Sequence, residues 1–170
     1  MHILNYYFTP FAVILIVFAV YFSEPGRNIT YASFAILAAS FGINYWFTQN
    51  TYRFMRWMHN IRALMVWLNL ATTTVLFYLL FPYWAPMWLL FILAPATSAM
   101  FMKKTQVFII AFASAAAMLG AYYTKSILLE MPFGQQLWAT AAVQALFVIF
   151  FSMFVAAMSE MILKVRDSLR

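Results

Sequence analysis

The sequence predicts an all-α membrane protein, a polytopic bundle of six transmembrane helices with both termini in the cytoplasm. Of its 170 residues, 66% are hydrophobic and only 8% are charged. A soluble domain carries about 25% charged residues, because its surface must be wetted. A membrane helix needs roughly 20 apolar residues, so the chain has room for about six such helices. The absence of cysteine excludes disulfides and thiolate metal sites.

Six apolar stretches, separated by turn signals, are the predicted transmembrane helices. They are residues 4–22, 31–48, 61–81, 85–101, 107–123 and 137–163. The first stretch lacks the charged start and the cleavage site of a signal peptide, so we expect it to remain in the mature protein. The second follows a polar turn at Pro25-Gly26, and a hairpin with Pro82 separates the third from the fourth. Pro95 lies inside the fourth stretch and is expected to bend it.

The basic residues of the predicted loops give the orientation. One side of the membrane receives Arg53, Arg56, Arg62, Lys103, Lys104, Lys164, Arg166 and Arg170, and the other receives Arg27 and Lys125. By the positive-inside rule, the side with more basic residues is cytoplasmic, as in a bacterial inner membrane. Because the basic residues are sparse and lie between apolar runs, we do not expect a nucleic-acid partner.

The predicted spans lack the chemistry of an enzyme or an ion-coupled transporter. No Asp, Glu, Lys, Arg or His falls near the middle of any stretch, and such residues mark proton relays and ion pathways. The two histidines, His2 and His59, lie outside the spans, so they cannot ligate a haem inside the bundle. No metalloprotease, nucleophile-elbow or phosphate-binding motif is present. We therefore expect no catalytic residues, no metal and no cofactor.

Two sets of residues are candidates for a ligand pocket. Trp84 and Trp88 are four residues apart, so in an α-helix both rings project from one face, where they and Phe91 could cover an apolar cavity. Ser98 and Gln144 are neutral polar residues inside predicted spans, where each needs a hydrogen-bond partner. The alternative interpretations are an interfacial aromatic belt for the tryptophans, and bonds between helices for the polar side chains.

The fifth stretch carries small residues at helical spacing. Ala113, Ala117 and Ala121 recur every four residues, and Gly120 lies beside them. Small residues let two helix backbones approach closely in lipid. The stripe therefore predicts a helix that is central in the bundle or that forms a dimer.

The last stretch is too long for the membrane. Residues 137–170 contain no proline or glycine, and a helix of that length reaches about 51 Å, whereas the hydrocarbon is about 30 Å thick. We therefore expect a transmembrane domain at 1–157 and a cytoplasmic exit helix at 158–170. Met158, Ile162, Val165 and Leu169 follow the 4-3-4 spacing of a coiled-coil seam, which predicts a homodimer. The alternative is an amphipathic helix end that lies on the lipid headgroups.

The layout resembles the six-span membrane sensor modules of bacterial signalling proteins, namely the N-terminal region of autoinducer-sensing histidine kinases and of membrane-anchored cyclases. The features that carry the resemblance are a basic loop after the second stretch, the Trp84-x-x-x-Trp88 hairpin, the Lys103-Lys104 loop and the final helix towards Arg170. The resemblance implies that the bundle binds a small apolar ligand or lipid, with Trp88 as the leading candidate for a ligand contact, followed by Phe91, Ser98 and Gln144. It also implies a cytoplasmic kinase or cyclase output domain, fused or separate, which receives the signal from dimeric exit helices.

Two other functions fit the same pattern. A substrate-binding subunit of an energy-coupling-factor-type vitamin transporter also has six short-looped spans and needs no buried charge. A non-catalytic scaffold subunit of a membrane complex is the third possibility, and it predicts a chain that is unstable without its partners.

Overall fold

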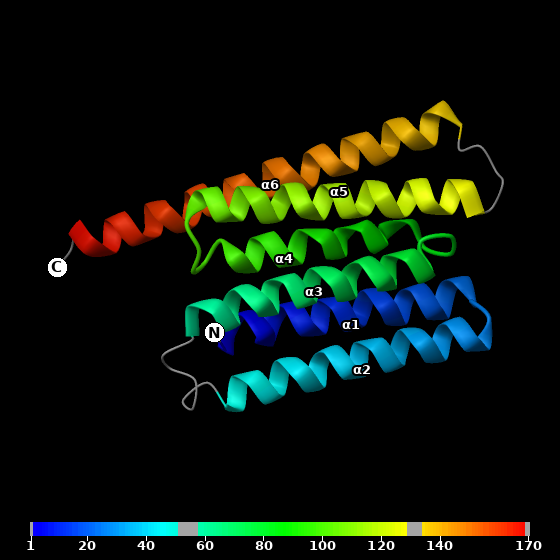
Figure 1. The fold of residues 1–170 in the computed structure, drawn as a ribbon, viewed down its shortest axis with the longest axis horizontal. Helices are drawn as coiled ribbons and strands as arrows, with labels where there is room; N and C mark the ends of the chain where they lie inside the picture. The colour runs from blue at the N-terminus through cyan, green and yellow to red at the C-terminus, as the bar shows by residue number, and fades with distance from the viewer. Residues whose placement is uncertain (1, 51–57, 129–133, 169–170) are drawn as a thin grey trace. The chain divides into compact units, whose positions relative to one another are not determined.

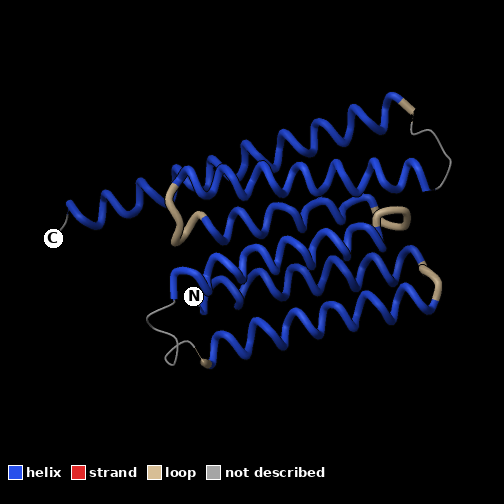
Figure 2. The backbone as a smooth tube through the Cα atoms, viewed as in Figure 1, coloured by secondary structure: helices blue, strands red, loops and turns tan. Residues whose placement is uncertain are grey.

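The computed structural model describes residues 2–50, 58–128 and 134–168, and these are helical throughout apart from short turns (Figures 1 and 2). The described part contains six α-helices, one 3₁₀-helix and no strand. The elements are α1 (His2–Ser23), α2 (Arg27–Gln49), α3 (Met58–Leu80), η2 (Ala85–Leu89), α4 (Leu90–Ser98), α5 (Lys104–Leu128) and α6 (Gln135–Ser168). The all-α prediction is confirmed for these residues.

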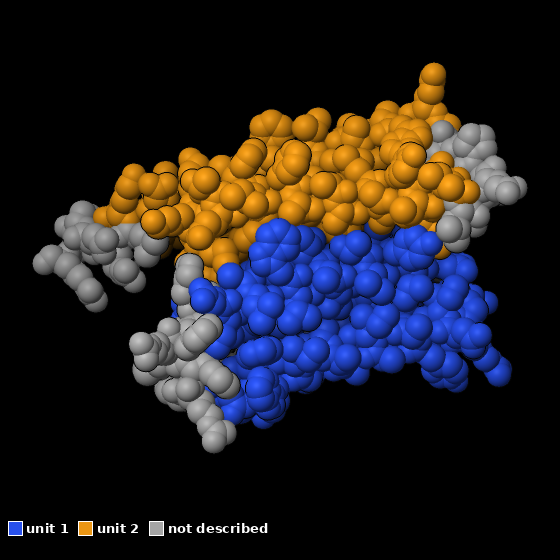
Figure 3. Space-filling model, viewed as in Figure 1, with its two compact units in different colours: residues 1–90 blue, residues 91–170 orange. Residues whose placement is uncertain are grey.

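The chain divides into two compact units, residues 1–90 and 91–170 (Figure 3). In unit 1, α2 lies against α1 and α3, and η2 touches α1 and α3. Its largest fully buried side chains include Phe77 and Leu80 of α3 and Ile16 of α1. Phe77 stacks on Phe81, with ring centroids 5.1 Å apart.

Unit 2 is built around the antiparallel pair α5 and α6, which run side by side (Figure 1). The buried positions of α6 are small for the most part, and they recur every three or four residues. They are Ala141, Ala145, Val148, Ser152 and Ala156. Near the beginning of α5, Val107 packs with Ala156 of α6 and with Ala99, which follows α4.

Among the residues that the structure describes, three helices are long and apolar enough to cross a membrane. They are Asn60–Leu80 in α3, Lys104–Ile127 in α5 and Gln135–Ile162 in α6. Each coincides with a predicted span. The helices α3, α5 and α6 begin two or three residues before the apolar stretches that predicted them, and α5 and α6 also end five residues after them. The extension follows because backbone hydrogen bonds continue a helix after its apolar residues end, until a turn interrupts them.

The prediction of one continuous helix at 85–101 is wrong. The segment starts as the 3₁₀-helix η2, continues as α4 and ends at Ser98, after which residues 99–101 form turns. Pro86 stands in the first turn of η2, where its missing N–H is not needed. Only 14 residues, Ala85–Ser98, form a continuous apolar helical segment there.

Candidate functional site

The hairpin between α3 and η2 is closed by backbone hydrogen bonds to the last turn of α3. The N–H groups of Tyr83 and Trp84 both donate to the carbonyl of Leu80, at 2.9 and 3.0 Å. Trp84 then adopts an extended backbone as the residue that caps η2. The hairpin thus places the Trp84 side chain at the end of unit 1 where α1 ends and α2 begins.

The Trp84 ring stacks on Phe22 of α1, with centroids 5.8 Å apart and planes 17° apart. Its indole nitrogen Nε1 is buried and has no hydrogen-bond partner among the described residues. A buried donor without an acceptor costs about 1–3 kcal/mol. Trp84 therefore combines an aromatic stack with a hydrogen-bond donor for which the described residues provide no acceptor.

Trp88 does not share the helical geometry on which its pairing with Trp84 was predicted. Trp84 precedes the helix, and η2 is a 3₁₀-helix with about three residues per turn, so positions four apart do not point in the same direction. Trp88 is half-buried in η2. The α-helical spacing that predicted a common face for the two indole rings is absent.

Phe91 and Ser98 both lie on α4, in unit 2. Phe91 is fully buried, and the buried Ser98 hydroxyl donates to the Pro95 carbonyl at 2.7 Å. The Thr97 hydroxyl makes the equivalent bond to the Ala94 carbonyl, also at 2.7 Å. These hydroxyls cap carbonyls in the last turn of α4, so local backbone groups use their hydrogens.

Gln144 bonds across the α5–α6 pair. The Tyr122 hydroxyl of α5 donates to Gln144 Oε1 at 2.8 Å. Unit 1 contains a similar link, in which Asn44 Nδ2 of α2 donates to Asn69 Oδ1 of α3 at 3.0 Å. The bond of Gln144 agrees with the alternative interpretation of this residue, in which a polar side chain within an apolar helix bonds to a neighbouring helix. The Asn44–Asn69 bond is of the same kind.

Two serines resemble Trp84 in having no partner. Ser33 of α2 and Ser114 of α5 are fully buried, and neither hydroxyl has a hydrogen-bond partner among the described residues. The Ser152 hydroxyl of α6, in contrast, donates to the carbonyl of Val148 one turn earlier. Ser33, like Trp84, belongs to unit 1, whereas Ser114 and Ser152 belong to unit 2.

The small residues of α5 divide between two environments. Ala121 is buried, whereas Ala113 and Ala117 are half-buried. Gly120 is exposed, and a Cβ atom built there meets nothing within 4 Å. Gly120 therefore does not serve a close helix approach within the described chain.

The exit-helix residues Met158, Ile162 and Val165 are all exposed. Leu169, the fourth residue of the predicted seam, lies outside the described residues, as do Arg53, Arg56 and Arg170 of the orientation argument. Beside the seam, Lys164 and Glu160 form an exposed salt bridge of 3.1 Å, one turn apart.

The candidate ligand-binding residues are divided between the units. Trp84 and Trp88 belong to unit 1, whereas Phe91, Ser98 and Gln144 belong to unit 2. Sequence reasoning missed Phe22, the stacking partner of Trp84. The available signal was its place as the last aromatic residue of the first apolar stretch, on the side of the membrane where the hairpin was expected. No protein-family model, curated protein or solved structure matches this chain.

Proposed function

We propose that this chain is a membrane sensor or anchor module of the bacterial inner membrane. In this proposal its six helical segments cross the bilayer, with both termini in the cytoplasm. The bundle binds a small apolar ligand or lipid, and a dimeric exit helix transmits its state to a cytoplasmic kinase or cyclase output domain, fused or separate.

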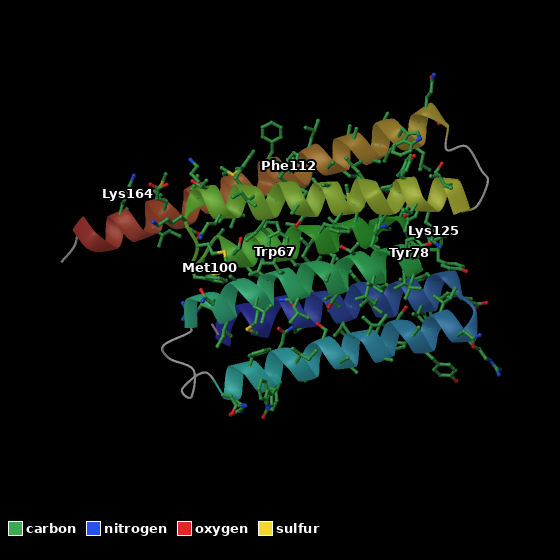
Figure 4. All side chains as sticks on the ribbon, in the orientation of Figure 1. Trp67, Tyr78, Met100, Phe112, Lys125 and Lys164 are labelled. Carbon is green, nitrogen blue, oxygen red and sulfur yellow. The ribbon has the colours of Figure 1, made fainter. Side chains whose placement is uncertain are left out.

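The length and the end of α6 are the observation that supports this function. As one continuous helix of 34 residues, α6 reaches about 51 Å, and hydrocarbon occupies only about 30 Å. Its C-terminal part continues past the beginning of α5, and Lys164 lies on that part (Figures 1 and 4). A helix that runs unbroken from lipid into water can carry a displacement or rotation from one to the other.

Trp84 supports the ligand part of the proposal. An apolar molecule with one acceptor oxygen would satisfy the unused indole N–H, while its body lies against the stacked rings of Trp84 and Phe22. The hairpin carries no acidic or basic residue from Phe81 to Leu90. A neutral ligand or a lipid acyl ester fits this environment better than an ion does.

Cysteine crosslinking in native membranes tests the dimeric exit helix. The sequence contains no cysteine, so single cysteines can be introduced without a background. Oxidation of the Ile162→Cys and Val165→Cys variants should produce a covalent dimer. A chain that stays monomeric at both positions would contradict the proposal.

Labelling with a membrane-impermeant maleimide tests the orientation. In intact spheroplasts, Glu24→Cys should react from outside, whereas Lys104→Cys and Lys164→Cys should react only after lysis. The opposite pattern would contradict the cytoplasmic termini.

Native mass spectrometry tests the ligand. The protein purified from its membrane should retain a small molecule, and Trp84→Phe should lose it, because phenylalanine preserves the stack and removes the donor. The control is Trp67→Phe on the exposed side of α3, which should retain it. Equal retention by both variants would exclude the Trp84 site.

A further inference from the structure

Ser33 of α2 carries a buried hydroxyl that differs from most hydroxyls of the chain. Its side chain is fully buried, and Oγ has no hydrogen-bond partner among the described residues. Other helical hydroxyls, such as those of Thr74 and Ser98, donate to a backbone carbonyl three or four residues earlier. Burial of an unpaired polar group is costly, so a ligand that supplies the missing partner gains affinity at such a position.

The register of α2 against α3 places Ser33 opposite Leu80. The two helices are antiparallel, and Asn44 of α2 donates to Asn69 of α3 (Figure 1). Ser33 lies 11 residues before Asn44, and Leu80 lies 11 residues after Asn69. Because 11 residues make about three helical turns, Ser33 and Leu80 face each other as the bonded pair does. The full burial of both side chains agrees with this placement.

Trp84 belongs to the same end of unit 1. Its backbone N–H donates to the Leu80 carbonyl at 3.0 Å, so Trp84 follows Leu80 by about one helical turn, a rise of about 5 Å. Its indole Nε1 is a buried donor without an acceptor among the described residues, and its ring stacks on Phe22 in the last turn of α1. Two buried polar groups without partners, Ser33 Oγ and Trp84 Nε1, are therefore anchored on either side of the end of α3.

The chemistry of these two groups favours an occupant with two acceptor oxygens and no charge. An indole N–H can only donate a hydrogen bond, and a serine hydroxyl carries one hydrogen to donate. The part of α2 after Arg27 and the part of α3 after Arg62 contain no acidic or basic residue. A pair of ester carbonyls satisfies both donors without burying a charge, which a phosphate or an ammonium group would do.

The level of Leu80 matches the ester layer of a bilayer. The apolar span of α3 is Asn60–Leu80, so Leu80 stands where a stretch of membrane-spanning length ends. In a membrane, this level is the boundary between hydrocarbon and headgroups. A diacyl lipid has its two ester groups at that boundary, on neighbouring carbons of glycerol. Such a lipid presents two acceptor oxygens at the level of Ser33 and Trp84.

We propose that Ser33 and Trp84 form a two-point binding site for the paired ester groups of a diacyl lipid. Trp84 Nε1 donates to one ester carbonyl, and the Ser33 hydroxyl donates to the other. This inference rests on the ligand part of the proposed function and names the class of ligand. One donor at Trp84 accepts any neutral molecule with a single oxygen, whereas the second donor requires two oxygens close together.

Binding of two matched probes to the purified, delipidated full chain tests the site. Dioleoylglycerol carries two ester groups, and its dioleyl ether analogue has the same chains and free hydroxyl but no ester carbonyl. Native mass spectrometry from detergent micelles measures both affinities. The wild-type chain should bind the diester about tenfold more tightly than the diether. Ser33→Ala and Trp84→Phe should each weaken diester binding about fivefold, the size of one hydrogen bond, and leave diether binding unchanged.

Ser114→Ala is the matched control. It removes the other fully buried serine hydroxyl without a partner among the described residues, and it lies in unit 2. Its affinity for both probes should equal that of the wild-type chain. A fivefold loss of diester binding in this variant would indicate a general effect of removing a buried hydroxyl and would overturn the site.

The remaining outcomes separate this inference from the proposed function. A loss confined to Trp84→Phe would overturn the two-point site and leave the ligand site at Trp84 standing. Unchanged diester binding in both variants, or a loss confined to Ser33→Ala, would overturn the two-point site and the Trp84 site together. Equal binding of the two probes by the wild-type chain, or binding of neither, would overturn the recognition of ester groups. The molecule that the chain retains from its own membrane should have the mass of a diacyl lipid, and a smaller one would overturn the lipid as the source.

Discussion

The two units both join neighbouring helices through a side-chain amide, but they fill their interiors differently. Unit 1 buries large side chains such as Phe77 and Leu80, whereas α6 of unit 2 buries mainly alanine and serine. Lipid is as apolar as a protein interior, so helices in a membrane gain little from burying apolar surface as such. Large side chains then stabilise by filling space, and small ones by allowing two backbones to approach. We therefore expect that substitutions which remove side-chain volume destabilise unit 1 most, and that substitutions which add side-chain volume destabilise unit 2 most.

The largest effect is expected from Phe77→Ala in unit 1. Phe77 is fully buried and stacks on Phe81, so its removal leaves a cavity. We expect a loss of about 3 kcal/mol, at the low end for buried phenylalanine because transfer into lipid costs nothing. The free energy of unfolding in mixed detergent micelles measures it. Phe34→Ala, on the exposed side of α2, is the control and should change little.

Added volume in unit 2 should have the next largest effect. Ala145→Leu places a bulky side chain in the buried stripe of α6 and should cost about 1–3 kcal/mol by overpacking. Ala142→Leu makes the same change at an exposed position of the same helix, so it should be neutral in the same unfolding assay. Equal stability of the two variants would show that the stripe is not closely packed.

The two amide links should be similar in strength. A double-mutant cycle with Asn44→Ala and Asn69→Ala should give a coupling of about 1 kcal/mol, the usual size for hydrogen bonds between helices in a membrane. The cycle with Tyr122→Phe and Gln144→Leu should give a comparable value. A coupling near zero in one cycle would remove this similarity between the units.

The smallest effect is expected from glycines on exposed helix faces. Gly42 of α2 and Gly120 of α5 each have no atom within 4 Å of a built Cβ. Replacement of either by alanine should therefore stabilise its helix equally, by about 0.5–1 kcal/mol. Thermal denaturation compares the two variants. A loss of stability or of dimer confined to Gly120→Ala would show that a second helix packs on α5 there.

The sequence predicted the helical elements well, because each depends on a long apolar run that is visible in one dimension. The starts of α5 and α6 fall within three residues of the predicted ones. The fourth stretch was the exception: its apolar content predicted one helix at 85–101, but the backbone begins as the 3₁₀-helix η2, changes to α4 at Leu90 and ends its helix at Ser98. Apolar residues continue across that change of backbone, so hydropathy alone could not detect it.

The candidate ligand site was less predictable than the helices. The sequence marked Ser98 and Gln144 as polar residues that need partners, but it could not name those partners. Gln144 bonds to Tyr122, which lies near the end of the predicted span 107–123. Pairing depends on the rotation of each helix about its axis, and residue order alone does not fix that rotation.

The sequence by itself determined that the chain belongs in a membrane, that it is helical and that its last helix is long. These properties follow from the content of apolar and charged residues and from the absence of proline and glycine in the last stretch. Only the tertiary structure decided which faces are used. It buried the alanine stripe of α6, exposed the side of α5 that carries Gly120, and gave the Trp84 indole N–H no acceptor among the described residues. Burial is a property of neighbours in space, and those neighbours come from helices far apart along the chain.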